Sequence, residues 1–488
     1  MTQLSNATLA QLDPQVAVPT YDRTAVTPGI VHFGVGGFHR AHQAYYLDQL
    51  MNQGKALDWG IIGAGLLPGD AAMRDALLKQ DGLYTLVAKA PSGTWEPRVI
   101  GSIIGYLYGP DDPAALVFQI MDPAIRIVSL TVTEGGYNFD QVTGDFIATN
   151  PAVQAEVAGG APTTWFGYLY AALAARRAVG APPFTVMSCD NIQDNGAVAR
   201  KALVAYAALR DPDMAAWIAS EVHFPSSMVD RITPRTTPDD VTTVRERYGI
   251  EDAWPVVTED FIQWCLTDDF PLGRPPYQDA GVQVVADVEP YELMKLRLLN
   301  ASHQGLAYFA WLAGYRLVHD AARDPLIAQF LLRYMNEEAT PTLRPVPGID
   351  LPAYKLQLIE RFSNAEVKDT VARLAAESSD RIPKWLIPVV RERLDQGGAV
   401  PLSAAIVASW ARYAEGTDEQ GQPIDIVDNA EAQVRAAARG QSLDPLAFLR
   451  QESFFGNLVE RPGFVQPYLD ALDSLHTKGA VETLKQFL

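Results

Sequence analysis

The chain has 488 residues, of which 48% are hydrophobic and 20% charged, and its formal net charge is −19. Such an acidic surface repels nucleic acids and anionic membranes, so neither is expected as a partner. The two cysteines, Cys189 and Cys265, lie far apart in the sequence, which argues against a zinc cluster or a disulfide framework and favours a reducing cytoplasm.

Residues 29–188 alternate short β-branched runs with helical stretches, which is typical of an α/β domain with a parallel sheet. We predict a helix at residues 41–52 and strands at residues 30–33, 59–62, 125–132 and 184–188. The order of these elements predicts a Rossmann-like dinucleotide-binding domain over residues 1–286.

A glycine-rich turn, Gly34-Val35-Gly36-Gly37-Phe38, follows the first predicted strand and precedes a helix. Glycines let the backbone approach a pyrophosphate, and a helix N-terminus supplies N–H donors to it. His39 stands in place of the third glycine of the full fingerprint, so a turn without a ligand remains an alternative. His39 and His42 could suggest a metal pair, but no third ligand lies nearby and we expect no metal.

The second predicted strand leads into a loop that ends at Asp70, the candidate acid for the adenosine ribose. A carboxylate there would accept from the ribose hydroxyls and repel a 2′-phosphate, which favours NAD over NADP. Asp70 lies farther along the chain than the usual spacing, so a solvated loop aspartate is the alternative.

Polar residues follow the strand predicted at residues 184–188, in the segment Ser188-Cys189-Asp190-Asn191. Ligands of open parallel sheets bind at the carboxyl ends of the strands, so Asn191 is a candidate donor to a developing alkoxide. The segments 132–137 and 228–234 are similarly polar, although loop capping explains them nearly as well.

Long helical patterns replace the strands after about Asp287, for example at residues 355–361, 369–377 and 430–438. Pro290 suits the first turn of a helix, where a missing N–H costs nothing, so the boundary is placed just before it. Residues 287–488 are predicted to form a mainly α-helical substrate and catalytic domain.

The first helix of this domain carries Glu292, Lys295, Asn300 and His303 among apolar residues. At about 100° per residue, and with Lys295 at zero, these side chains fall between roughly 0° and 140° around an α-helix. Desolvation lowers the pKa of a lysine, so Lys295 could accept a proton near neutral pH. A lone lysine on an apolar helix usually reaches solvent, and it is the grouping of four polar residues that favours a catalytic site.

These segments, in this order, resemble the mannitol dehydrogenase family of polyol-specific long-chain dehydrogenases over essentially the whole chain. The matching motifs are residues 34–42, 133–137, 188–191 with 195–196, 229–234, and Lys295 with Asn300 and His303; residues 328–335 and 362–364 are similar too. The resemblance implies a monomeric, metal-independent enzyme that uses NAD to oxidise a secondary alcohol on an acyclic polyol or to reduce the matching ketose.

The same resemblance implies roles for individual residues. Lys295 would be the general base, with Asn191 and Asn300 as the oxyanion hole, His303 orienting the substrate and the lysine, and Glu292 serving proton exchange. The implied substrate contacts are Asp230, Arg373 and Arg381, and the implied cofactor contacts are Gly34, Gly36, Gly37, Phe38, Asp70, Glu134 and Val229. Some members carry a lysine where this chain has Arg381 and an acid where it has Gly69, which leaves the role of Arg381 and strict NAD selectivity open.

The resemblance favours oxidation of D-mannitol to D-fructose. A D-arabinitol or D-sorbitol dehydrogenase is one alternative, and a reductase of fructuronate or tagaturonate, with Arg373 and Arg381 binding the carboxylate, is another. A nucleotide-sensing protein without turnover is a third, but such a protein would be expected to lack the base or the donors, and both are present.

Overall fold

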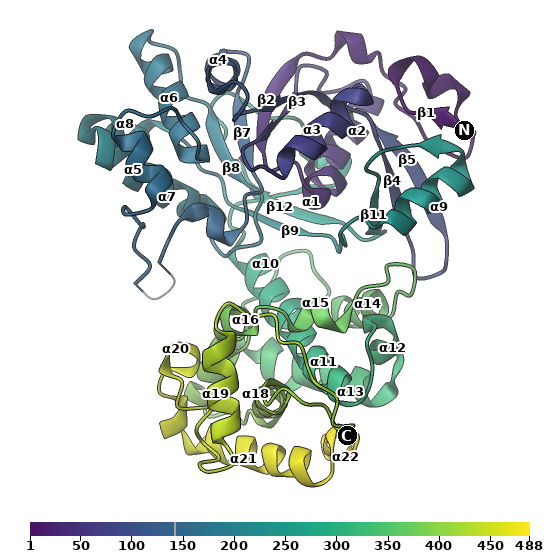
Figure 1. Cartoon of the computed structure of the whole chain (residues 1–488), viewed down its shortest axis with the longest axis vertical. Coiled ribbons are helices and arrows are strands. Elements are labelled where there is room, and N and C mark those ends of the chain that lie inside the picture. Colours follow the sequence, from purple (N-terminus) through teal and green to yellow (C-terminus); the bar gives the residue numbers. More distant parts are fainter. Residues whose placement is uncertain (141–142) are drawn as a thin grey trace. The chain divides into compact units, whose positions relative to one another are not determined.

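The computed structural model describes residues 1–140 and 143–488, which divide into two compact units, Met1–Glu289 and Pro290–Leu488. In Figure 1 the first unit runs from purple to teal and the second from green to yellow. Every strand of the described residues belongs to the first unit, and the second is built from helices.

Five parallel strands form the main sheet of the first unit, in the order β6-β3-β2-β7-β8. These strands are β2 (Pro28–Phe33), β3 (Gly60–Gly65), β6 (Ile103–Tyr108), β7 (Ile127–Leu130) and β8 (Thr185–Ser188). The chain first builds outward from β2 to β3 and β6, and then returns to add β7 and β8 on the other side of β2. The predicted parallel Rossmann-type sheet is confirmed, and its strand order reverses beside β2, where dinucleotides bind in this fold.

Helices cover both faces of this sheet, which explains why its strands are apolar on both sides. Neighbouring residues of one strand enter different cores: Ile30 belongs to the cluster that contains Leu47, and Val31 to the cluster that contains Leu169. The helices of the unit are α1 (Gly37–Ala41), α2 (Gln43–Asn52), α3 (Asp70–Lys79), α4 (Pro113–Met121), α5 (Pro151–Val157), α6 (Trp165–Ala178), α7 (Asn195–Arg210), α8 (Pro212–Glu221) and α9 (Pro238–Tyr248).

Three smaller sheets complete the first unit, with the orders β11-β4-β5, β13-β12-β9 and β1-β10. Their strands, which the sequence did not predict, are β1 (Thr2–Gln3), β4 (Tyr84–Lys89), β5 (Trp95–Ile100), β9 (Ser227–Asp230), β10 (Ile250–Glu251), β11 (Val256–Glu259), β12 (Gln263–Thr267) and β13 (Gln283–Val285). Two predicted elements differ in extent. The helix expected at residues 41–52 divides into α1 and α2 at His42, and the strand expected at 125–132 is shortened at both ends to β7, before the chain turns at Thr133 with a φ of 65°.

The second unit is mainly α-helical, as predicted. Its elements are α10 (Glu289–Met294, which begins one residue before the unit), η5 (Lys295–Asn300), α11 (Ala301–Leu312), α12 (Val318–Arg323), α13 (Pro325–Arg333), η6 (Tyr334–Ala339), η7 (Thr340–Thr342), α14 (Leu351–Phe362), α15 (Val371–Ala375), α16 (Ser378–Trp385), α17 (Ile387–Asp395), α18 (Pro401–Ala414), α19 (Glu431–Gly440), α20 (Glu452–Phe455), α21 (Pro462–Thr477) and α22 (Ala480–Lys485). Helix α11 lies at the centre of the unit, and nearly all of its residues are buried.

The described residues include no helix that combines the length and hydrophobicity needed to cross a bilayer. Cys189 and Cys265 are both buried free thiols.

Candidate active site

The glycine-rich turn connects β2 to α1 in a conformation that requires glycine at its first position. Gly34 has a φ of +90°, and a Cβ added there would lie 2.0 Å from the carbonyl oxygen of Thr131, which directly follows β7. A Cβ at Gly36 would meet nothing closer than 3.9 Å, and one at Gly37 nothing closer than 3.6 Å. The turn therefore presents bare backbone at the start of α1, which fits the approach of a pyrophosphate.

His39 occupies the place of the third glycine, and its side chain is buried against β2. Its ring stacks on that of His32 in β2, with centroids 3.4 Å apart and planes 12° apart. The His32 Nδ1 lies 2.7 Å from the Ser129 hydroxyl. Burial lowers the pKa of His32 to about 3 and that of His39 well below its usual value, so both rings are neutral packing groups.

No group of three or more possible metal ligands occurs in the described residues. The His42 Nε2 lies 2.9 Å from the Gln263 carbonyl oxygen, and its ring stacks on Phe38 with centroids 4.9 Å apart. Phe38 therefore packs beside the turn, within α1.

Asp70 begins α3 and caps the loop that precedes it. One carboxylate oxygen, Oδ2, accepts hydrogen bonds from the backbone N–H groups of Leu66 and Leu67, both at 2.9 Å. The capping role follows from this geometry, and the predicted contact with a ribose stays a prediction.

A buried carboxylate, Asp190, fixes the loop that follows β7. Its oxygens accept from the backbone N–H groups of Val132 at 3.1 Å and Thr133 at 2.8 Å, and from the Tyr137 hydroxyl at 2.6 Å. These bonds hold Thr133 at its positive φ, a conformation that costs of order 1–3 kcal/mol for a residue other than glycine. Glu134 follows on this loop and is exposed. The sequence named Asp190 only as part of a polar segment and did not reveal this role.

Asn195 connects the end of β8 to β9. Its Nδ2 donates to the Asp190 carbonyl at 3.0 Å and to the Ser227 carbonyl at 2.7 Å, and its Oδ1 accepts from the Ser227 N–H at 2.9 Å. These bonds join the turn after β8, which contains the exposed Asn191, to Ser227 at the start of β9. Val229 and Asp230 lie at the end of the same short strand and are buried.

The polar helix of the second unit is not a continuous α-helix. Residues 295–300 form a π-helix, η5, in which the N–H of Ala301 donates to the carbonyl of Leu296, five residues earlier. The expectation of a regular α-helix is wrong here, because such a turn contains one residue more than an α-turn. The extra residue rotates everything after it by about 100° relative to Lys295, which reduces the angle between Lys295 and Asn300 from roughly 140° to roughly 40°.

The π-turn thereby brings the four predicted polar residues into a sector of about 80°, narrower than a regular helix would allow. All four are buried, with exposed fractions of 5% for Glu292, 7% for Lys295, 4% for Asn300 and 8% for His303. The alternative in which the lysine reaches bulk solvent is therefore wrong. π-turns inside α-helices occur frequently at functional sites.

His303 is a buried imidazole in electropositive surroundings. Its ring packs on Phe362 with centroids 4.4 Å apart, and its Nε2 has no hydrogen-bond partner within residues 1–140 and 143–488. Burial and the nearby cations, chiefly Arg373 and Arg361, hold its pKa well below the usual value. The neutral ring can therefore accept a hydrogen bond from a ligand or donate one to it.

The two predicted substrate arginines lie together. The Arg373 Nε donates to Asp369 Oδ1 at 2.6 Å, and Arg381 Nη1 donates to the Arg373 carbonyl at 3.1 Å. Arg361, at the end of α14, is a buried cation near His303 that was not predicted as a site residue, although it immediately precedes the family motif at residues 362–364.

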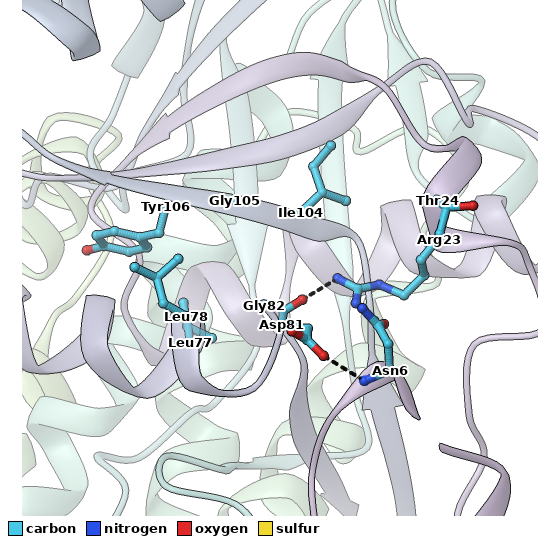
Figure 2. A pocket seen from close by; sticks show the side chains of 10 residues that line it. All are labelled: Asn6, Arg23, Thr24, Leu77, Leu78, Asp81, Gly82, Ile104, Gly105 and Tyr106. Carbon is cyan, nitrogen blue, oxygen red and sulfur yellow. Dashed lines mark hydrogen bonds between the residues drawn. The ribbon is translucent and has the colours of Figure 1, made fainter. Parts of the chain in front are cut away.

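A pocket of about 360 Å³ in the first unit is separate from these residues (Figure 2). It is lined by the end of α3, by the segment Ile104-Gly105-Tyr106 of β6 and by Asn6 and Arg23. Because β6 and β3 are parallel, the start of β6 lies at the sheet edge opposite the glycine turn. Arg23 Nη2 already donates to the Asp81 carbonyl at 2.8 Å, and the Asn6 N–H donates to the Asp81 carboxylate at 2.9 Å. The pocket is therefore no part of the candidate site.

Two family models together match most of the chain: the mannitol dehydrogenase Rossmann domain over residues 28–279 and the mannitol dehydrogenase C-terminal domain over residues 287–476. The chain belongs to the mannitol dehydrogenase family.

Individual relatives match this chain over nearly its full length. A mannitol 2-dehydrogenase of Aspergillus fumigatus is 43% identical over 481 residues, which cover 97% of this chain and 96% of the relative. The solved structure of Pseudomonas fluorescens mannitol 2-dehydrogenase in a ternary complex with NAD and D-mannitol is 44% identical, with a TM-score of 0.91 and coverage of 100% of this chain and 99% of that one. A solved D-sorbitol dehydrogenase is 38% identical, also with a TM-score of 0.91, and covers 99% of this chain and 100% of that one.

Proposed function

We propose that this chain catalyses the NAD-dependent oxidation of D-mannitol to D-fructose and the reverse reduction. The observation that carries the proposal is the 44% identity, over the whole chain, to a mannitol 2-dehydrogenase whose solved structure holds NAD and D-mannitol. Two features of this chain support it: the bare backbone of the glycine turn after β2, and the buried group of Lys295, Asn300 and His303.

In the proposed reaction, the Lys295 amine accepts the proton of the reacting hydroxyl as general base. The Asn300 amide, one π-turn farther along, donates to the oxygen as it gains negative charge, and Asn191 is the proposed second donor. When bound, NAD would supply the acceptor for the hydride.

The remaining residues are proposed in supporting roles. His303, with its available Nε2, orients the substrate and the lysine, and Glu292 exchanges the proton with solvent. Asp230, Arg373 and Arg381 are the proposed substrate contacts, and Gly34, Gly36, Gly37, Phe38, Asp70, Glu134 and Val229 the proposed cofactor contacts.

The experiment that tests the proposal is a substrate panel followed through NADH absorbance, with mannitol, sorbitol, arabinitol and fructuronate offered in turn. We expect the highest kcat/KM with D-mannitol and D-fructose, unchanged rates in EDTA, and elution as a monomer in size-exclusion chromatography. The match to a D-sorbitol dehydrogenase makes sorbitol the strongest competitor. A higher kcat/KM with sorbitol or fructuronate would replace the mannitol assignment, and loss of activity in EDTA would refute metal independence. A cytoplasmic location is likewise a proposal, consistent with the two buried free thiols.

The cofactor preference can be tested with Asp70→Asn. The amide oxygen can still accept from Leu66 and Leu67, so the loop cap survives while the negative charge is removed. We expect the ratio of kcat/KM for NADP to that for NAD to rise roughly tenfold, because repulsion of the 2′-phosphate is lost. Asp75→Asn, on the same helix, is the control and should leave the ratio unchanged. An unchanged ratio in Asp70→Asn would remove Asp70 from cofactor selection.

A further inference from the structure

We infer that Tyr334, together with the ion pair of Arg297 and Glu392, is a positioning residue that holds the π-turn at Lys295–Asn300 in place and so aligns the proposed base with the proposed donor. The inference rests on the proposed function of that turn. It assigns a role in the reaction to two residues outside the polar helix, Tyr334 and Glu392.

The backbone of η5 leaves one carbonyl without a partner in the helix, and Tyr334 donates a hydrogen bond to it. When a helix returns from i→i+5 to i→i+4 hydrogen bonds, one carbonyl is passed over by the ladder. The i→i+5 bond at the end of η5 is accepted by the Leu296 carbonyl, and the next carbonyl along the chain is that of Arg297. This Arg297 carbonyl accepts the Tyr334 hydroxyl at 3.1 Å, in a fully buried position.

The side chain of Arg297 fixes the same residue from a second direction. Its Nη1 and Nη2 donate to the two carboxylate oxygens of Glu392 on α17 at 2.7 and 2.6 Å, and Nη1 also donates to the Thr342 carbonyl at 2.7 Å. A bidentate arginine–carboxylate pair restricts both the position and the orientation of the guanidinium. Arg297 lies between Lys295 and Asn300, so fixing Arg297 restrains the positions of both residues.

Tyr334 is itself well placed to act as a fixed donor. It begins a second π-helix, η6, and its side chain has no exposed surface. Burial and the nearby Glu338 raise the pKa of its hydroxyl well above the usual value, so the proton stays on the oxygen. Glu338, on the same π-helix, accepts from the backbone N–H groups of Leu402 at 2.7 Å and Ser403 at 2.8 Å, which fastens η6 to the start of α18.

The π-turn matters for catalysis because Lys295 precedes the extra residue of the turn, whereas Asn300 and His303 follow it. If the turn relaxed to an α-helix with the excess residue displaced elsewhere, Asn300 and His303 would rotate by about 100° relative to Lys295. Misplacement of a catalytic group by about 1 Å can cost roughly a hundredfold in rate. The π-turn is thus part of the proposed catalytic geometry, and Tyr334 and Glu392 act through it.

The test is Tyr334→Phe in the full-length enzyme, which removes the hydroxyl and keeps the ring. We expect kcat with mannitol to fall roughly tenfold to a hundredfold, the pH profile of kcat/KM to be displaced, and the affinity for NAD to stay within twofold. Hydrogen exchange of the peptide that contains residues 295–301 should be faster. Glu392→Gln, which weakens the second anchor, should change the same quantities in the same direction by a smaller factor, and it carries the test if Tyr334→Phe does not fold.

The control is Tyr468→Phe, which removes another buried hydroxyl of the second unit, one that donates to Gln441. It should leave kcat, the pH profile and the exchange of residues 295–301 unchanged. The inference is overturned if Tyr334→Phe keeps wild-type kcat and wild-type exchange, or if Tyr468→Phe changes them equally. Because exchange is read without substrate, failure of the inference is distinguishable from failure of the proposed function, which would appear as an inactive wild-type enzyme with normal effects on exchange.

Discussion

Replacement of Lys295 by alanine is expected to lower kcat for mannitol oxidation by roughly 10²-fold to 10⁴-fold, the range that a positioned general base contributes. The affinity for NAD should stay near that of the wild type, because the proposed cofactor residues belong to the other unit. Steady-state kinetics at saturating NAD, together with a fluorescence titration of NADH, measure both quantities. In the wild type, kcat/KM should rise with pH to a plateau, because the neutral amine is the form that accepts the proton.

Lys295→Met provides the matched variant for this experiment, since methionine fills the buried space without supplying an amine. A loss of similar size in both variants assigns the effect to the amine rather than to a cavity. Near wild-type turnover in either variant, or a flat pH profile with chemistry shown to be rate-limiting, would refute Lys295 as the base.

Replacement of Gly34 by alanine is expected to destabilise the first unit by roughly 2–6 kcal/mol, as the sum of backbone strain and overpacking. The φ of +90° disfavours any side chain, and the new Cβ would lie 2.0 Å from a backbone oxygen that cannot move away without distorting β7 and its loop. Urea unfolding followed by tryptophan fluorescence measures the loss. NAD binding should be abolished in whatever fraction remains folded.

Two other glycines separate the causes of this effect. Gly54→Ala introduces backbone strain without a steric clash, because Gly54 has a φ of +72° and open space around it. We therefore expect the free energy of unfolding to fall by about 1 kcal/mol. Gly36→Ala meets no atom closer than 3.9 Å and should fold normally while binding NAD more weakly, since its methyl group would occupy the approach of the pyrophosphate. Equal stability of Gly34→Ala and Gly54→Ala would show that the contact with Thr131 is unimportant.

Much of the first unit was predictable because its signals are local. The strand β2, its glycine turn and the following helix can be recognised from residues within about 25 positions of one another, and the buried parallel strands appear as continuous apolar runs. The short strands β9 to β13 were not predicted, since strands of two to five residues without clear alternation carry little signal. The six-residue strands β4, β5 and β6 were missed as well, although β6 belongs to the main parallel sheet. The end of α1 also escaped prediction, because an unusual backbone conformation at His42 sets it, and β7 is shorter at both ends than its apolar run indicated.

The residue types in the polar helix and in the glycine turn can be identified without a structure, and they indicate the kind of chemistry that each segment can support. Their arrangement depends on contacts with distant parts of the chain. The hydroxyl that meets the Arg297 carbonyl comes from a tyrosine 37 positions away, and the carboxylate that holds its guanidinium lies 95 positions away. A helical pattern read at a fixed angle per residue contains no information about such distant partners, and their hydrogen bonds are what make a π-turn stable where an α-turn would otherwise form.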